Sequence, residues 1–240
     1  MNAIAEIPIL TPRSLTIWRE VLPPNELGAL QARFEPVRRL FASFLTTDDG
    51  DPDEAFLMAS SRYAHLRLEI LQALLSIVGH VELARLLDKI PEFASDLVER
   101  EGWRLGEGVT PLRKAWETYA RIMRLLRENQ TSLSRVQTPP CGLVMALTRM
   151  DFSLTATAMY LEGEFPNAAS TRVLYLCRAA ETEAASVEAI ILDALSPLDS
   201  TEKKLKTLRE LFGSWQGGDE LDEDLKQLYE SRLDRSVEPS

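Results

Sequence analysis

The stretch that decides the fold is LRKAWETYARIMRLL, which runs from Leu112 to Leu126. Apolar residues recur in it in alternating steps of four and three, the period of an α-helix with one buried face. They are Leu112, Trp116, Tyr119, Met123 and Leu126. Charged residues fall on the other face, namely Arg113, Glu117, Arg121 and Arg124. The pattern predicts an amphipathic helix that packs against other helices.

A second apolar stripe predicts close packing between helices later in the chain. Between residues 167 and 195 the same period is kept mostly by small side chains. They are Val173, Cys177, Ala180, Ala184, Val187, Ile191 and Ala194. Because small side chains let backbones approach, we expect a neighbouring helix to lie close to this stripe.

Helix-start signals place the other long helices. Asp51-Pro52-Asp53-Glu54 combines a capping side chain with proline at the first helical position, and predicts a helix to about Val78, before Gly79. Three proline signals predict helices over about 110–135, 140–161 and 167–195. Shorter helices are expected over 91–101 and from Asp199, and Pro36 is expected to interrupt or kink the stretch 25–45.

These elements predict an all-α fold, an antiparallel helical bundle of about four long helices with shorter helices at both ends. We expect residues 1–215 to form a single helical domain, with a subdivision near 102–109 as the alternative. Residues 216–240 should form a hinge, an acidic amphipathic helix and a polar tail.

Composition narrows the class of protein. The chain has 240 residues, a net charge of −10 and two cysteines, which do not form a disulfide framework. Its longest apolar runs, such as 143–147, are about five residues, whereas a membrane span needs about 20. The start of the chain lacks the pattern of a signal peptide. We therefore expect a cytoplasmic protein without a membrane segment.

Charge is unevenly distributed along the chain. Residues 101–180 carry ten Lys/Arg against seven Asp/Glu, and residues 181–240 carry seven against 15. The candidate contact residues in the basic part are Arg113, Arg121, Arg124 and Arg127. Such a face is either a solvated, salt-bridged surface, a docking site for an acidic protein surface, or a contact for a nucleic-acid phosphate backbone.

The acidic C-terminal segment is a second candidate for contact. Leu221, Leu225 and Leu228 fall on one face of the predicted helix that follows Gly217-Gly218. A tethered amphipathic helix engages a partner groove or folds back onto its own domain. Trp18, Trp103 and Trp215 fall near predicted helix ends or connectors, where an exposed aromatic side chain can anchor a partner.

Candidate catalytic groups are sparse. His65 and His80 are the two histidines, and neither has a glutamate three residues before it, as a di-iron bundle requires. His65 and Glu69 share a helix face, but two residues do not make a metal site. Cys141 lies at a predicted helix start, where a thiol pKa is lowered, whereas Cys177 belongs to an apolar stripe.

Two further patterns each allow a structural and a functional interpretation. Gly102, Gly106 and Gly108 precede a predicted helix start, which favours either a connector or an anion-binding loop. The acidic residues of the later helices favour a solvated face, structural ion pairs or paired carboxylates. They are Asp151, Glu181, Glu183 and Glu188. A buried Asp151 would need a partner, and Arg149 is near in sequence.

These observations favour a non-enzymatic helical adaptor, regulator or small subunit that acts through protein–protein contacts in a larger assembly. We expect no metal and no cofactor, and a protein partner or a second copy of the chain. The first alternative is a subunit of a nucleoprotein complex that contacts phosphates through the Arg113–Arg127 face. The second is a helical-bundle enzyme or small-molecule sensor, with His65, Glu69, Asp151 and Cys141 as its best residues.

Overall fold

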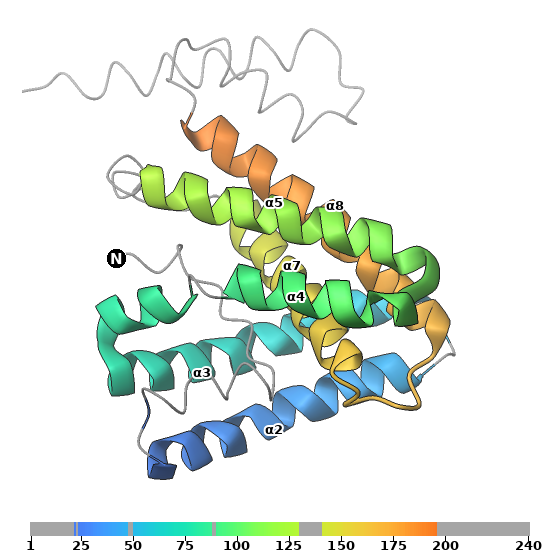
Figure 1. The fold of residues 1–240 in the computed structure, drawn as a ribbon, viewed down its shortest axis with the longest axis horizontal. Helices are drawn as coiled ribbons and strands as arrows, with labels where there is room; N and C mark the ends of the chain where they lie inside the picture. The colour runs from blue at the N-terminus through green and yellow to red at the C-terminus, as the bar shows by residue number, and fades with distance from the viewer. Residues whose placement is uncertain (1–21, 23, 48–49, 88–89, 130–140, 196–240) are drawn as a thin grey trace, which may run out of the picture. The chain divides into compact units, whose positions relative to one another are not determined.

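The computed structural model describes residues 22, 24–47, 50–87, 90–129 and 141–195. For residues 78, 80–87, 90–93, 141 and 194 it describes the backbone only. Within these residues every regular element is a helix, which confirms the all-α class (Figure 1). The helices are α2 (Pro24–Thr46), α3 (Pro52–Leu87), α4 (Ile90–Glu101), the 3-10 helix η1 (Gly102–Gly108), α5 (Val109–Glu128), α7 (Cys141–Leu161) and α8 (Ser170–Leu195). The bundle of about four long helices is not confirmed.

Helix α7 forms the centre of the core. Every residue from Met150 to Met159 is buried, because the helix is covered on all sides. Its most extensive packing is with α8, and α8 in turn packs along α5. Figure 1 shows α5 and α8 side by side, with α7 passing behind them.

The helices α2 and α3 pack together and meet α7 through aromatic side chains. Phe152 of α7 lies edge-on to Phe41 at 5.0 Å and to Phe56 at 5.6 Å between ring centroids. Phe44 and Tyr63 join the same cluster, at 5.7 Å and 5.6 Å from Phe152. Offset and edge-on rings of this kind pack densely, so the cluster ties the first two helices to the core.

Several predicted features are confirmed. Asp51 caps α3, with its Oδ1 accepting a hydrogen bond from the Asp53 backbone N–H at 2.9 Å. Gly79 breaks the helical backbone inside α3, with φ 75° and ψ 172°, in the left-handed half of backbone space that favours glycine. The predicted stripe of α5 is buried or half-buried against the core, and its charged face is exposed.

Two predicted helix boundaries are wrong, namely the end of α5 and the start of α8. Helix α5 begins at Val109, directly from η1 and within one residue of the predicted start, and Gly108 supplies no capping side chain. It ends at Glu128, where the Asn129 side chain donates to the Leu125 carbonyl at 2.9 Å. Helix α8 begins at Ser170, because residues 163–169 form a turn in which the Ala169 N–H bonds to the Leu45 carbonyl.

Of the two effects expected at Pro36, an interruption of the helix is not found. Helix α2 runs through it from Pro24 to Thr46. Proline lacks the N–H that would bond to the carbonyl four residues earlier, at Ala32. Both Pro36 and Ala32 are exposed, so water can reach that carbonyl. The predicted division near residue 216 lies outside the described residues.

Candidate functional site

The candidate site is built on the segment that joins α4 to α5. Trp103 in η1 is 78% exposed, the most exposed of the large apolar side chains in the described residues. Exposure of this connector tryptophan was one of the expectations from the sequence. Trp18 and Trp215 lie outside the described residues.

The backbone that carries Trp103 is held in place on both sides. A side-chain carbon at Gly102 would lie 3.0 Å from Val109 Cγ2, so the turn is closely packed there. Arg104 donates from Nη1 to the Leu161 carbonyl at 2.9 Å, and its guanidinium lies 5.1 Å from the centre of the Tyr160 ring. The turn therefore presents the indole to solvent from a backbone that is anchored to the end of α7.

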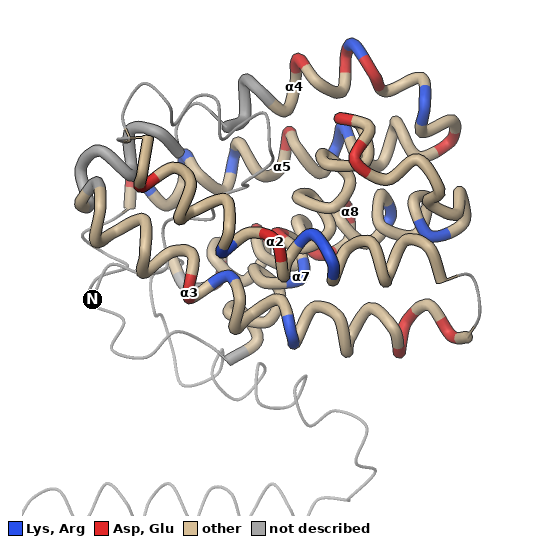
Figure 2. The backbone as a smooth tube through the Cα atoms, turned by 90° about the horizontal axis from the view of Figure 1, so that it is seen from below, with Lys and Arg blue, Asp and Glu red and all other residues tan. Residues whose placement is uncertain are grey.

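A groove of about 380 Å³ runs between α4 and α5 on the same segment. Its lining residues are Ser95, Val98, Glu99, Arg113, Trp116, Glu117 and Ala120. Val98 and Trp116 are buried and form an apolar floor, whereas Glu99, Arg113 and Glu117 are exposed at the rim. We call the groove together with Trp103 the α4–α5 surface. Figure 2 shows acidic and basic positions interspersed along α4 and the turn after it.

The four predicted arginines do not form one uniform stripe. Arg113 faces the groove beside α4. Arg121 instead pairs with Glu188 of α8 through two hydrogen bonds, Nε to Oε1 at 2.7 Å and Nη2 to Oε2 at 3.1 Å. Arg124 and Arg127 are exposed on α5. The predicted face is therefore divided, with Arg121 turned toward α8.

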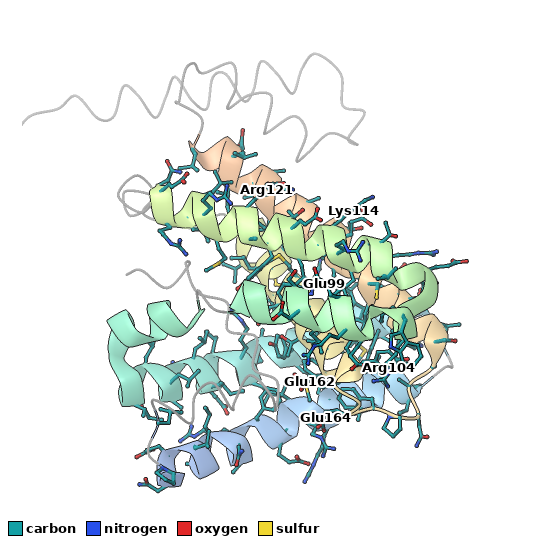
Figure 3. All side chains as sticks on the ribbon, in the orientation of Figure 1. Glu99, Arg104, Lys114, Arg121, Glu162 and Glu164 are labelled. Carbon is teal, nitrogen blue, oxygen red and sulfur yellow. The ribbon has the colours of Figure 1, made fainter. Side chains whose placement is uncertain are left out.

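A second cross-helix pair lies on the same side of α5. Lys114 Nζ lies 3.0 Å from Glu181 Oε1. Figure 3 shows Lys114 and Arg121 along the edge of α5 that borders α8. The hydrogen bond from Arg121 is the main cause that holds the pKa of Glu188 below its ordinary value. Lys114 and Arg121 thus fit the interpretation of the basic face of α5 as a salt-bridged surface.

Asp151 is buried, and its ion-pair partner is Arg67 rather than Arg149, the arginine nearest in sequence. Its Oδ2 accepts hydrogen bonds from the Tyr63 hydroxyl at 2.8 Å and from Arg67 Nε at 2.7 Å. Burial raises the pKa of Asp151, and the charge of Arg67 opposes the shift. Arg149, which the sequence suggested as the partner, instead lies 3.6 Å from Glu183. This cluster satisfies buried polar groups of α3 and α7.

The remaining chemical candidates are not brought together. His65 and Glu69 are exposed on α3, and the described residues contain no group of three or more His, Cys, Asp or Glu placed to hold a metal ion. Cys177 is buried, and burial raises the pKa of its thiol to about 12, which confirms its assignment to the core. The side chains of His80 and Cys141 lie outside the described residues.

The glycine-rich connector forms a closely packed 3-10 turn in which one N–H group is already bonded. The N–H of Val109 donates to the Gly106 carbonyl, which occupies a donor that an anion would need. Gly106 has φ 54°, as a tight turn requires, and Gly108 packs against Cys177. The three glycines therefore serve a compact 3-10 connection.

Sequence reasoning missed three arginines whose side chains donate hydrogen bonds to groups far away in the chain. Arg67, Arg104 and Arg172 are each matched with groups between 57 and 125 positions away in the chain. Nothing in the local sequence distinguishes them from exposed arginines. The candidate partner helix with Leu221, Leu225 and Leu228 lies outside the described residues.

Comparison with known proteins finds no family model, no curated protein and no solved structure that matches this chain. None of the helices in the described part is both long enough and apolar enough to cross a bilayer.

Proposed function

We propose that this chain is a non-enzymatic helical adaptor, regulator or small subunit, and that it contacts a protein partner through the α4–α5 surface. The observation that carries the proposal is Trp103, which is 78% exposed on a turn that Arg104 anchors to α7. Tryptophan is the residue most enriched at binding hot spots, because it buries a large area with few rotatable bonds. A preorganised backbone also lowers the entropy lost on binding.

The groove between α4 and α5, the two helices that the Trp103 turn joins, suggests the chemistry of the partner. Its apolar floor, Val98 and Trp116, accepts an apolar side chain. Its rim carries Glu99 and Glu117 against Arg113. The acidic side chains outnumber the basic one, so the complementary partner is an amphipathic segment with basic residues beside its apolar anchor.

The test is recovery of partners from the native host with the full-length tagged chain. Trp103→Ala should reduce the amount of recovered partner by about tenfold or more, as expected for loss of a hot-spot residue. Leu68→Ala is the matched control, because Leu68 is 53% exposed on α3, away from this surface. Circular dichroism should show the same helix content for both variants.

The same experiment distinguishes the other interpretations. Recovery that is unchanged by Trp103→Ala, or reduced equally by Leu68→Ala, would contradict the proposal. Material that is lost on nuclease treatment would favour the phosphate-backbone alternative. For that alternative the useful variant is Arg113→Gln with Arg124→Gln, because Arg121→Glu would place a second carboxylate against Glu188 and disturb the fold.

A further inference from the structure

A second pocket, of about 450 Å³, opens where the first turns of α3 meet α7 and α8. Its size falls in the range of small-molecule sites. Three of its lining side chains are apolar, and the others are charged or hydroxyl-bearing. They are Phe56, Leu57 and Ala179, with Asp53, Arg149, Tyr175, Arg178, Thr182 and Glu183. It involves none of the residues of the α4–α5 surface.

Arg149 has hydrogen-bonding capacity left in this pocket. Its Nη1 lies 3.6 Å from Glu183 Oε1, a long ion pair, and its Nε is buried without a hydrogen-bond partner among the described residues. The side chain is 29% exposed. Because the ion pair to Glu183 is long and the side chain is partly exposed in the pocket lining, the guanidinium can take a planar acceptor from the pocket.

Arg178 supplies a second cation at the rim of the pocket. Its side chain is 66% exposed, and its one ion-pair contact in the described part of the chain is to Glu107, at 3.9 Å. Such a long contact between exposed groups is weak. Arg178 therefore has donors to offer an anion that enters the pocket beside Arg149.

The charge balance of the walls selects the ligand. Asp53 and Glu183 face the same space as the two arginines, and Asp53 already accepts a hydrogen bond from the Tyr175 hydroxyl at 2.7 Å. A dianionic phosphate would be repelled by both carboxylates. A singly charged carboxylate matches the guanidinium fork and adds less repulsion. The apolar wall formed by Phe56 and Leu57 requires an apolar body on the ligand.

We propose that this pocket binds a small monocarboxylate, with the carboxylate held by Arg149 and Arg178 and a compact apolar body against Phe56 and Leu57. Sequence reasoning did not find this site, because its residues come from three helices and are separated by up to 130 positions. The proposal is independent of the protein partner, since the two surfaces share no residue.

The experiment is an NMR titration of the full chain, labelled with ¹⁵N, with four probes. Phenylacetate and hexanoate present aromatic and aliphatic bodies, phenylacetamide lacks the charge, and inorganic phosphate lacks the apolar body. We expect at least one of the two acids to shift amides near residues 53–57 and 178–183, with a dissociation constant of about 1 mM or tighter. Phenylacetamide and phosphate should bind at least about tenfold more weakly.

Variants locate the binding. Thr182→Trp fills the pocket from an exposed position, and Arg178→Gln removes the rim cation; each should weaken binding of the acid by about tenfold. Arg124→Gln, on exposed α5, is the matched control and should bind like the original chain. The proposal is overturned if neither acid binds, if the amide binds as well as the acid, or if Thr182→Trp leaves binding unchanged.

Discussion

At the scale of single residues, Asp151 is the side chain whose environment differs most from what its neighbours in sequence suggest. It is fully buried on a helix that is otherwise apolar or hydroxyl-bearing at this depth. Arg67 and Tyr63, both from α3, supply the hydrogen bonds to its Oδ2, and Thr155 of α7 donates to its Oδ1 at 3.4 Å. A buried ion pair adds little net stability, because desolvation offsets the attraction, but removing one partner leaves a buried charge unpaired.

Asp151→Asn should therefore lower the free energy of unfolding by about 3 kcal/mol, because Arg67 loses its counter-charge. Urea denaturation measures this, with Asp193→Asn on the exposed surface of α8 as the control that should change stability by less than about 0.5 kcal/mol. Replacing both partners, as Arg67→Met with Asp151→Leu, should cost less than the single change. Equal losses for Asp151→Asn and Asp193→Asn would contradict the assignment.

Gly108 is a second position where packing depends on one atom, because there is no room for a side-chain carbon. A side-chain carbon there would lie 2.9 Å from Cys177 Sγ and 3.3 Å from Cys177 Cβ, so the glycine permits the close approach of η1 to α8. Its φ of −73° is open to any residue, so the constraint is steric.

Gly108→Ala should destabilise the chain by about 1–3 kcal/mol through overpacking, and Cys177→Ala should recover part of that loss by making room. Thermal unfolding of the two single variants and the double variant gives the coupling. The control is Gly28→Ala on exposed α2, where nothing lies within 4 Å; alanine should stabilise that helix by about 0.5–1 kcal/mol. If the stability changes of Gly108→Ala and Cys177→Ala simply add in the double variant, the contact between these residues is not the cause of the destabilisation.

At the scale of elements, charged pairs connect α5 to α8 along the edge of their apolar contact. Arg121 meets Glu188 and Lys114 meets Glu181, so two of the basic residues of α5 neutralise acidic residues of α8. The two apolar stripes bring the helices together, and the charges fix their register. Basic residues of α5 are thus in contact with acidic residues of α8 within one molecule.

The Arg121–Glu188 pair makes stability depend on pH in a defined direction. Because the pKa of Glu188 is lowered in the folded chain, its contribution is present at neutral pH and is lost as the pH falls through the lowered pKa. Glu188→Gln should lower the free energy of unfolding by about 0.5 kcal/mol at pH 7, a small value because Arg121 is half exposed. Below the lowered pKa of Glu188 the substitution should have no effect on the free energy of unfolding.

Urea denaturation at several pH values, with Glu128→Gln on exposed α5 as the control, tests this dependence. A stability difference between the original chain and Glu188→Gln that persists below the lowered pKa would exclude the ion pair as its source.

At the scale of the folded region from residue 24 to 195, one buried arginine connects the α2–α3 pair to α8. Arg172 is 3% exposed and donates from Nε to the Thr47 carbonyl at 2.8 Å. Its guanidinium lies 5.3 Å from the centre of the Phe44 ring. The Tyr175–Asp53 hydrogen bond lies one turn further along α8. These contacts hold the start of α8 against the connection between α2 and α3.

Arg172→Met keeps an unbranched apolar stem but removes the guanidinium, so the carbonyl of Thr47 loses the donor at Arg172 Nε. We expect a loss of about 2–3 kcal/mol and faster hydrogen exchange in α2, with less change in α5. Arg178→Met, on the same helix but two-thirds exposed, is the matched control and should leave exchange in α2 unaltered. Uniform acceleration across all helices would show that Arg172 does not act locally.

By itself, the sequence determined the helical class, most helix positions and the buried face of α5, because these follow from local periodicity, caps and prolines. The stripe at Leu112, Trp116 and Tyr119 is buried as its spacing predicts. Trp103 was singled out from its place in a connector, and its exposure agrees with that reasoning.

Only the tertiary structure decided which distant groups meet. Asp151 pairs with Arg67 rather than with nearby Arg149, and Arg121 turns to Glu188, 67 positions away. The start of α8 moved to Ser170, where the N–H of Ala169 bonds to the distant Leu45 carbonyl. The physical reason is that periodicity reports which face of a helix is apolar, but not which neighbour covers it. Ion pairs and pockets between helices depend on that choice of neighbour.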